Sequence, residues 1–213
     1  NIGINAVLFN QFSSVKKIYL FEPNVSALSL AVENSILNGF SEKVRIFNYC
    51  ISNENDKILK FYSVLEGAAG SLHRDFSHTA NDLNSSYDVR TKTIDKICED
   101  ENVIPDLIKI DVEGHEYQVL EGSTETALKG RTRFLVEMHS SKILSMKENS
   151  NKILEWAKKV KYKVLYLKKM RYITDSNPVK DRGRCHLLCV PDDFILGKRL
   201  KSIKQSELNA HFE

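Results

Sequence analysis

The sequence contains no apolar stretch that approaches the ~20 residues needed to cross a bilayer, so we expect no transmembrane span. Proline and tryptophan are scarce, with four prolines and one tryptophan among 213 residues. Charged residues make up 28% of the chain and hydrophobic residues 42%, a balance that disfavours disorder. Because no internal repeat or low-complexity linker is present, we predict one globular domain over residues 1–213.

Cysteine is scarce as well. The four cysteines, Cys50, Cys98, Cys185 and Cys189, stand at irregular spacings that do not resemble a disulfide framework. Cys185 and Cys189 enclose His186, but no second ligand pair follows at zinc spacing, and the apolar run around them predicts a buried strand. The sequence also lacks a signal-peptide pattern. We therefore expect reduced thiols and a cytoplasmic location.

The positive and negative charges are unevenly distributed. The formal net charge is +3, yet residues 158–204 hold 14 Lys and Arg against 4 Asp and Glu. Such a segment could form a docking face for phosphates, nucleic acid or anionic lipid headgroups. Solvated lysines on the outside of helices and strands give the same count, and we favour that interpretation.

Short β-branched runs alternate with helical patterns, which favours βαβ units and a mostly parallel sheet with helices on both faces. The predicted strands are residues 18–22, 44–49, 57–64, 87–94, 106–111, 132–139, 163–167 and 185–190. Helices are predicted at residues 93–101, 114–120, 123–129 and 151–160, and after the first strand. That first helix is capped by Asn24 or Ser26 and closed by Gly39, with Val25, Leu28, Val32 and Ile36 at helical spacing.

Three segments fall outside this regular pattern. Residues 67–86 are rich in small and polar side chains and too long for a tight turn, so we expect a mobile loop there. We expect a helical tail over residues 192–213. The glycine turn at Gly3 stands where a doubly wound fold has its first strand-to-helix turn, so a first strand would lie upstream of residue 1 or be absent.

The glycine turn and an acidic strand end together predict a nucleoside site. Gly3 opens a helix, and Glu22 ends a strand about twenty residues later. A glycine turn lets a ligand approach the backbone, and an acidic side chain at the next strand end suits ribose hydroxyls. Because no G-x-G-x-x-G run is present, a dinucleotide such as NAD is disfavoured.

The sequence resembles the FkbM-type S-adenosylmethionine (SAM)-dependent methyltransferases. The resemblance rests on NIGINAVLF, YLFEPN, LNGFSEKVRIFN, PDLIKIDVEGHEYQVLEG and FLVEMH, of which the Ile-Asp-Val-Glu-Gly segment is the most specific. It implies a Rossmann-like α/β fold with an antiparallel last strand. It also implies O-methyl transfer to a sugar, glycan or polyketide-like small molecule.

Carried over position by position, the resemblance implies a set of cofactor contacts. Gly3 and Asn5 would line the methionine end of SAM, and Glu22 would bind its ribose. Asn24 and Asn48 would lie near the adenosine, and Ser71 would belong to a loop that closes over the cofactor. The turn departs from the family at Asn1 and Val7, where the family has Asp and a second Gly.

A second group of residues predicts the reaction centre: Asp111, Glu113, Glu137 and His139. Asp111 and Glu113 follow one predicted strand, and Glu137 and His139 share one face at the end of the next. Methyl transfer to an alcohol needs a group that accepts the hydroxyl proton. His139 has the better unperturbed pKa, whereas Asp111 or Glu113 would need burial, so the base stays open.

Two further readings concern the same region. Carboxylates and imidazole could also bind Mg²⁺ or Mn²⁺, an alternative that the sequence leaves open; our predicted site contains no metal. Glu116 belongs either to this group of ionisable residues or to a solvated helix face, and the sequence leaves that choice open. We interpret His115 and Glu121 as ordinary surface residues.

Two alternatives to a small-molecule methyltransferase remain at this stage. The departures at Asn1 and Val7 allow a catalytically silent domain that binds a partner. The basic segment 158–204 allows an RNA-directed methyltransferase, although we expect no nucleic acid partner.

Overall fold

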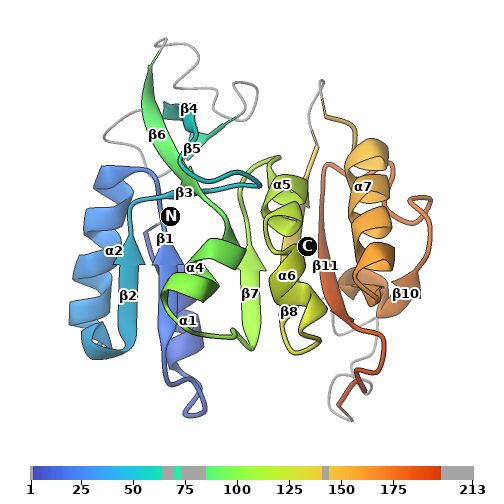
Figure 1. Cartoon of the computed structure of the whole chain (residues 1–213), viewed down its shortest axis with the longest axis horizontal. Coiled ribbons are helices and arrows are strands. Elements are labelled where there is room, and N and C mark those ends of the chain that lie inside the picture. Colours follow the sequence, from blue (N-terminus) through green and yellow to red (C-terminus); the bar gives the residue numbers. More distant parts are fainter. Residues whose placement is uncertain (1, 64–69, 73–84, 141–143, 198–213) are drawn as a thin grey trace. The chain divides into compact units, whose positions relative to one another are not determined.

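A computed structural model describes residues 2–63, 70–72, 85–140 and 144–197 (Figure 1). The chain forms two compact units, Asn1–Lys92 and Thr93–Glu213, which we describe in turn. Their boundary falls between a strand and the helix that follows it.

The first unit begins with two helices and a pair of parallel strands. The elements are α1 (Ile4–Asn10), β1 (Ile18–Phe21), α2 (Val25–Leu37), the short 3-10 helix η1 (Ser41–Lys43) and β2 (Val44–Phe47). β1 and β2 pair in parallel, with Ile18 opposite Val44 and Phe21 opposite Phe47. Helix α2 packs on α1 and β2, and lies beside β2 at the blue end of Figure 1.

Both predicted ends of α2 are confirmed. The Asn24 side chain accepts a hydrogen bond of 3.1 Å from the Ala27 N–H, as an N-cap does. At the other end, Gly39 is left-handed with a φ of 68°, and the Phe40 N–H reaches the Ser35 carbonyl at 2.9 Å.

The apolar repeat of α2 does not mark its buried face. Val25 is 55% exposed and Ile36 is 61% exposed, whereas Ala27, Ala31 and Ser35 are buried. The cause lies in the close approach of α1, because a Cβ added at Gly3 would stand only 3.2 Å from the Ala31 Cβ. Small side chains are needed along that contact.

The second sheet of this unit is made of four strands: β3 (Cys50–Ile51), β4 (Ile58–Ser63), β5 (Gly70–Ser71) and β6 (Ser86–Lys92). They lie in the order β3-β6-β4-β5, with β4 antiparallel to both neighbours and β3 parallel to β6. Phe61 and Val89 pack with Cys50 in its core. The predicted strands 57–64 and 87–94 are confirmed. Of the predicted mobile loop, residues 67–69 and 73–84 lie outside the described residues.

The second unit contains a five-stranded sheet in the order β10-β9-β11-β8-β7. Its elements are α4 (Ile94–Asp100), β7 (Leu107–Ile110), α5 (Glu116–Glu121), α6 (Thr124–Leu128), β8 (Arg133–His139), α7 (Met146–Lys159), β9 (Tyr162–Tyr166), η3 (Leu167–Lys169), β10 (Arg171–Ile173) and β11 (Arg184–Pro191). β7 and β8 are parallel, and β11 runs antiparallel between β8 and β9.

Helix α7 begins five residues before the predicted helix 151–160. Ser145 caps it, accepting a 3.2 Å bond from the Glu148 N–H, and the Glu148 carboxylate accepts in turn from the Ser145 hydroxyl. The helix packs on the sheet through Trp156, whose ring meets that of Phe134 edge-on at 5.3 Å between centroids. The predicted strand 132–139 is confirmed as β8.

The predicted α/β class is confirmed, but the sheets are mixed rather than mostly parallel. Among the described residues, parallel pairing joins only β1 to β2, β3 to β6 and β7 to β8. The physical reason is the length of the connections, since β9 reaches β10 through a four-residue turn and no crossover helix fits there. The antiparallel last strand is confirmed in β11.

The structure also bears on the predictions for the cysteines, the C-terminal residues and a membrane span. All four cysteines are buried and free, and two of them lie in strand β11. The described start of the predicted helical tail, residues 192–197, contains no helix, and residues 198–213 lie outside the described residues. Within the described residues, no helix combines the length and apolarity that a bilayer crossing requires.

Candidate active site

The predicted reaction centre assembles where two parallel strands end side by side. β7 ends at Ile110, which pairs with Val136, so Asp111 and Glu137 continue next to each other. The Nε2 atom of His139 lies 3.5 Å from the Glu113 carboxylate and 3.9 Å from those of Asp111 and Glu137. The four predicted residues thus come together around one imidazole nitrogen.

A partly buried lysine balances part of this negative charge. The Lys109 Nζ lies 3.1 Å from the Glu137 carboxylate and 3.7 Å from that of Asp111, with only 13% of the lysine side chain exposed. Burial raises the pKa of Glu137, but the hydrogen bond from Lys109 and the charges of His186 and Arg184 outweigh it, so the net pKa is lowered. Glu137 is therefore a carboxylate at neutral pH.

The donor types of this cluster match those of a divalent cation site. Asp111, Glu137 and His139 each place one donor atom within 4.8 Å of the others. Glu137, however, already contacts Lys109, and also Arg184 at 3.2 Å and His186 at 3.1 Å. Lys109 and Arg184 therefore compensate part of the charge of this cluster, and we assign no metal to it.

Glu113 is held in a strained backbone conformation. Its φ is 48°, in the left-handed region that few residues other than glycine adopt, and Gly114 follows with a φ of 94°. Burial is the largest cause of the raised pKa of Glu113; nearby Asp111 adds to it and His139 opposes it. Strain of this kind is typical of functional turns.

Of the two alternatives left open for Glu116, the structure excludes a solvated helix face. This side chain is completely buried, and its carboxylate accepts from three groups: the His139 Nδ1 at 2.9 Å, the Gly114 N–H at 2.9 Å and the Asn149 Nδ2 at 3.1 Å. His115, predicted on the surface, is only 8% exposed. Glu121 is exposed as predicted.

Helical spacing could have placed Glu116 and Asn149 inside. In α5, Glu116 precedes the buried Val119 and Leu120 by three and four residues, the spacing of one helix face. Asn149 precedes the buried Ile153 in α7 by four residues. A polar residue on an apolar face signals a buried polar contact.

The carboxylates around His139 change its basicity. Burial lowers the pKa of the imidazole, but the hydrogen bond to Glu116 and the charges of Glu113, Glu116 and Asp111 raise it more, so the net pKa is raised. His139 is therefore a stronger base than a free histidine.

In the first unit, the ends of β1 and β2 bring three predicted cofactor residues together. The Glu22 carboxylate is 6% exposed and accepts the Asn24 N–H at 2.8 Å. Asn48 donates its side-chain amide to the carbonyls of Glu22, at 2.9 Å, and Pro23, at 3.0 Å. Asn24 in turn donates to the Ser63 hydroxyl at 2.8 Å.

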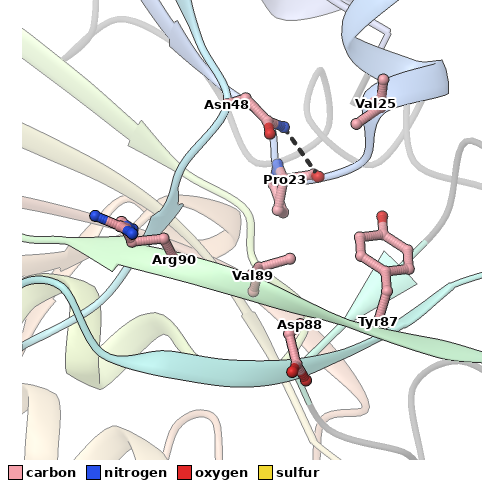
Figure 2. Close-up of a pocket in the computed structure, with 7 residues that line it drawn as sticks. All are labelled: Pro23, Val25, Asn48, Tyr87, Asp88, Val89 and Arg90. Atoms are coloured by element: carbon pink, nitrogen blue, oxygen red, sulfur yellow. Dashed lines mark hydrogen bonds between the residues drawn. The ribbon is translucent and has the colours of Figure 1, made fainter.

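A pocket of about 170 Å³ opens beside these residues (Figure 2). It is lined by Pro23, Val25, Asn48, Tyr87, Asp88, Val89 and Arg90. The Tyr87 hydroxyl is buried and finds no hydrogen-bond partner among the described residues. A buried hydroxyl without a partner is costly, and a bound polar ligand would satisfy it.

The other predicted cofactor residues lie apart from this pocket lining. Gly3 caps α1 in a left-handed conformation, and Asn5 is exposed in the first turn of that helix. Ser71 is buried in β5, where it pairs with Tyr62. Val7 donates its N–H to the Gly3 carbonyl at 3.0 Å, while Asn1 lies outside the described residues.

Comparison with known proteins now decides the family. A sequence model described as the methyltransferase FkbM domain matches residues 2–164, a span that crosses both units. The chain belongs to the FkbM methyltransferase family. The resemblance predicted from the Ile-Asp-Val-Glu-Gly segment is therefore confirmed.

Two curated relatives of the chain carry functional names. The 2-O-methyltransferase NoeI of Sinorhizobium fredii is 30% identical over 68% of the chain, and the hexuronic acid methyltransferase AglP of Haloferax volcanii is 30% identical over 66%. The matched parts span 62% and 53% of those two proteins. A crystal structure of an FkbM methyltransferase from Methylobacillus flagellatus covers 82% of this chain and 36% of its own, at 13% identity and a TM-score of 0.47.

Proposed function

We propose that this FkbM methyltransferase transfers the methyl group of SAM to a hydroxyl of a sugar or glycan. The observation that carries the proposal is the position of His139 Nε2 among the carboxylates of Asp111, Glu113 and Glu137. Family membership supports methyl transfer. The name of NoeI, a 2-O-methyltransferase, supports oxygen as the acceptor atom, and that of AglP, a hexuronic acid methyltransferase, supports a sugar as the acceptor.

The first unit offers the residues that would hold the cofactor. Glu22, Asn24 and Asn48 would contact the adenosine part, with the unsatisfied Tyr87 hydroxyl beside them. The pocket is smaller than the ~300 Å³ typical of whole-ligand sites, so it suits one part of the molecule. Gly3, Asn5 and Ser71 would contact the remainder. When bound, SAM supplies a methyl carbon whose bond to the positively charged sulfur breaks as the acceptor oxygen bonds to it.

The second unit offers the groups that would manage the proton. His139 Nε2 would accept the hydroxyl proton as the new carbon–oxygen bond forms, a contribution worth about 10²–10⁴-fold in rate. Asp111, Glu113 and Glu137 would stabilise the imidazolium that results, because each lies within 4 Å of Nε2. The family match crosses both units, which supports our prediction of a single domain.

The test separates cofactor binding from proton transfer. Titration calorimetry with SAM should give a dissociation constant below about 1 mM for the wild type, equivalent to more than 4 kcal/mol of binding. Glu22→Ala should weaken binding, whereas the control Glu42→Ala, at an exposed residue of η1, should not. His139→Gln should keep SAM affinity and lose transfer of labelled methyl groups to a panel of sugars that includes hexuronic acids.

One result would contradict this function, and a second would contradict only the role of His139. No heat with SAM at millimolar concentration would instead favour the catalytically silent domain. Full methyl transfer by His139→Gln would remove the histidine from the reaction and leave one of the carboxylates as the base.

A further inference from the structure

The contacts of Glu116 set the orientation of the imidazole at the candidate active site. We propose that Glu116, held by Asn149 and Gly114, is a positioning residue that keeps the neutral His139 ring protonated on Nδ1. Nε2 is then the nitrogen that receives a proton. This consequence for catalysis rests on the proposed function, whereas the position of the proton does not.

The Glu116 side chain is completely buried. Glu116 has no exposed surface, and its only polar partners among the described residues are the backbone N–H of Gly114, the imidazole of His139 and the amide of Asn149. A buried carboxylate without full hydrogen bonding is strongly destabilising, so these donors are needed.

The hydrogen bond between Glu116 and His139 has a fixed direction. A carboxylate can only accept, so the His139 Nδ1 atom at 2.9 Å must carry a hydrogen. A neutral imidazole carries one hydrogen, and Nε2 is therefore the unprotonated nitrogen. That atom faces the carboxylates of Asp111, Glu113 and Glu137.

Both oxygens of the Glu116 carboxylate are held by hydrogen bonds. Oε1 accepts from both Gly114 and His139, and Oε2 accepts from Asn149. Asn149 is 1% exposed and lies in α7, and its amide also approaches the His139 carbonyl at 3.4 Å. Groups from the 113–114 turn, from β8 and from α7 thus converge on one carboxylate.

The left-handed turn explains why Gly114 can contribute. Two consecutive left-handed residues, Glu113 and Gly114, direct the Gly114 N–H back onto a side chain two residues later. For a residue other than glycine such a conformation is costly, and it persists where the surroundings require it. The turn therefore serves the same carboxylate that orients His139.

The experiment measures the proton position directly. In protein labelled with ¹⁵N-histidine, long-range ¹H–¹⁵N spectra distinguish the protonated from the unprotonated ring nitrogen, and a His139→Gln sample assigns the signals. Recorded at a pH where His139 is neutral, the wild type should show hydrogen on Nδ1. Glu116→Leu should increase the population with hydrogen on Nε2, because no acceptor then faces Nδ1 while the carboxylates of Asp111, Glu113 and Glu137 still face Nε2. The matched control Glu121→Leu, on the same helix but exposed, should leave the spectrum unchanged.

A neutral His139 with hydrogen on Nε2 in the wild type would overturn the proposal, even if Glu116→Leu failed to fold. An unchanged proton position in a folded Glu116→Leu would overturn it too. These spectra need neither SAM nor an acceptor, so they stand apart from a failure of the proposed function. If methyl transfer is established, Glu116→Leu should lower kcat about 10²-fold or more and shift its pH profile while SAM affinity stays unchanged.

Discussion

The glycine at the start of α1 offers the sharpest test of how the first unit is built. Gly3 has a φ of 82°, and a methyl group added there would lie 3.2 Å from the Ala31 Cβ and 3.3 Å from its Cα. The left-handed conformation alone costs about 1–2 kcal/mol for a residue with a Cβ, and lost freedom of the unfolded chain returns about 0.4–1 kcal/mol. Overpacking against a buried backbone adds about 1–2 kcal/mol. We therefore expect Gly3→Ala to lower the free energy of unfolding by about 2–3 kcal/mol.

Gly39→Ala separates the two contributions. Gly39 is also left-handed, with a φ of 68°, but a Cβ there would meet nothing within 4 Å. It should therefore cost only the backbone strain, about 1 kcal/mol. Urea unfolding of both variants, followed by circular dichroism, measures the difference, and calorimetry with SAM measures cofactor affinity. Only Gly3→Ala should weaken SAM binding, because only that turn belongs to the proposed cofactor site.

Equal destabilisation by the two variants would refute the packing argument, since the contact with Ala31 is the feature that distinguishes them. A Gly3→Ala protein that loses stability but binds SAM with unchanged affinity would refute the role of the turn in cofactor binding and leave the packing argument standing.

Two further predictions concern charge at the strand ends. His139 has a raised pKa in the folded state. Its contribution to stability is therefore fully present below its ordinary pKa of 6.5 and is lost as pH rises through the folded-state pKa. The carboxylates that face the imidazole are those of Asp111, Glu113, Glu116 and Glu137. Denaturant unfolding across this range should show the advantage of wild type over His139→Gln shrinking as pH rises, and a constant difference would contradict the assigned charge state. Lys109→Met should cost about 2 kcal/mol, because it leaves a half-buried carboxylate with fewer cations. The control Lys96→Met removes an equally paired but more exposed lysine and should lower the free energy of unfolding far less, so equal losses by urea unfolding would refute the role of burial.

The parts of the fold that could be predicted are those encoded locally. The Asn24 cap, the left-handed Gly39 and the β-branched strand 132–139 each depend on a few adjacent residues. Strand pairing depends on distant segments, and the mixed character of the sheets was therefore missed. The strand β10 was also missed, because Arg171 and Tyr172 are exposed and carry no apolar pattern.

The candidate site shows the same division. Asp111, Glu113, Glu137 and His139 could be grouped because parallel strands end at one edge of a sheet. Asn149 could not be connected to them, since its distance from Glu116 is set by the packing of α7 on α5 and not by any local motif. Local spacing likewise did not show that α2 turns Ala31 toward Gly3 and leaves Val25 and Ile36 exposed.

The charge balance of the site extends beyond the part of the chain that matches the family. That match ends at residue 164, yet Arg184 and His186 lie in β11, which inserts between β8 and β9 and pairs directly with the end of β8. Both side chains contact Glu137, one of the carboxylates beside His139. The Arg184 side chain is also 65% exposed, so part of it is accessible to solvent beside the cluster. The charge of Glu137 therefore depends on β11 as well as on the strands inside the family match.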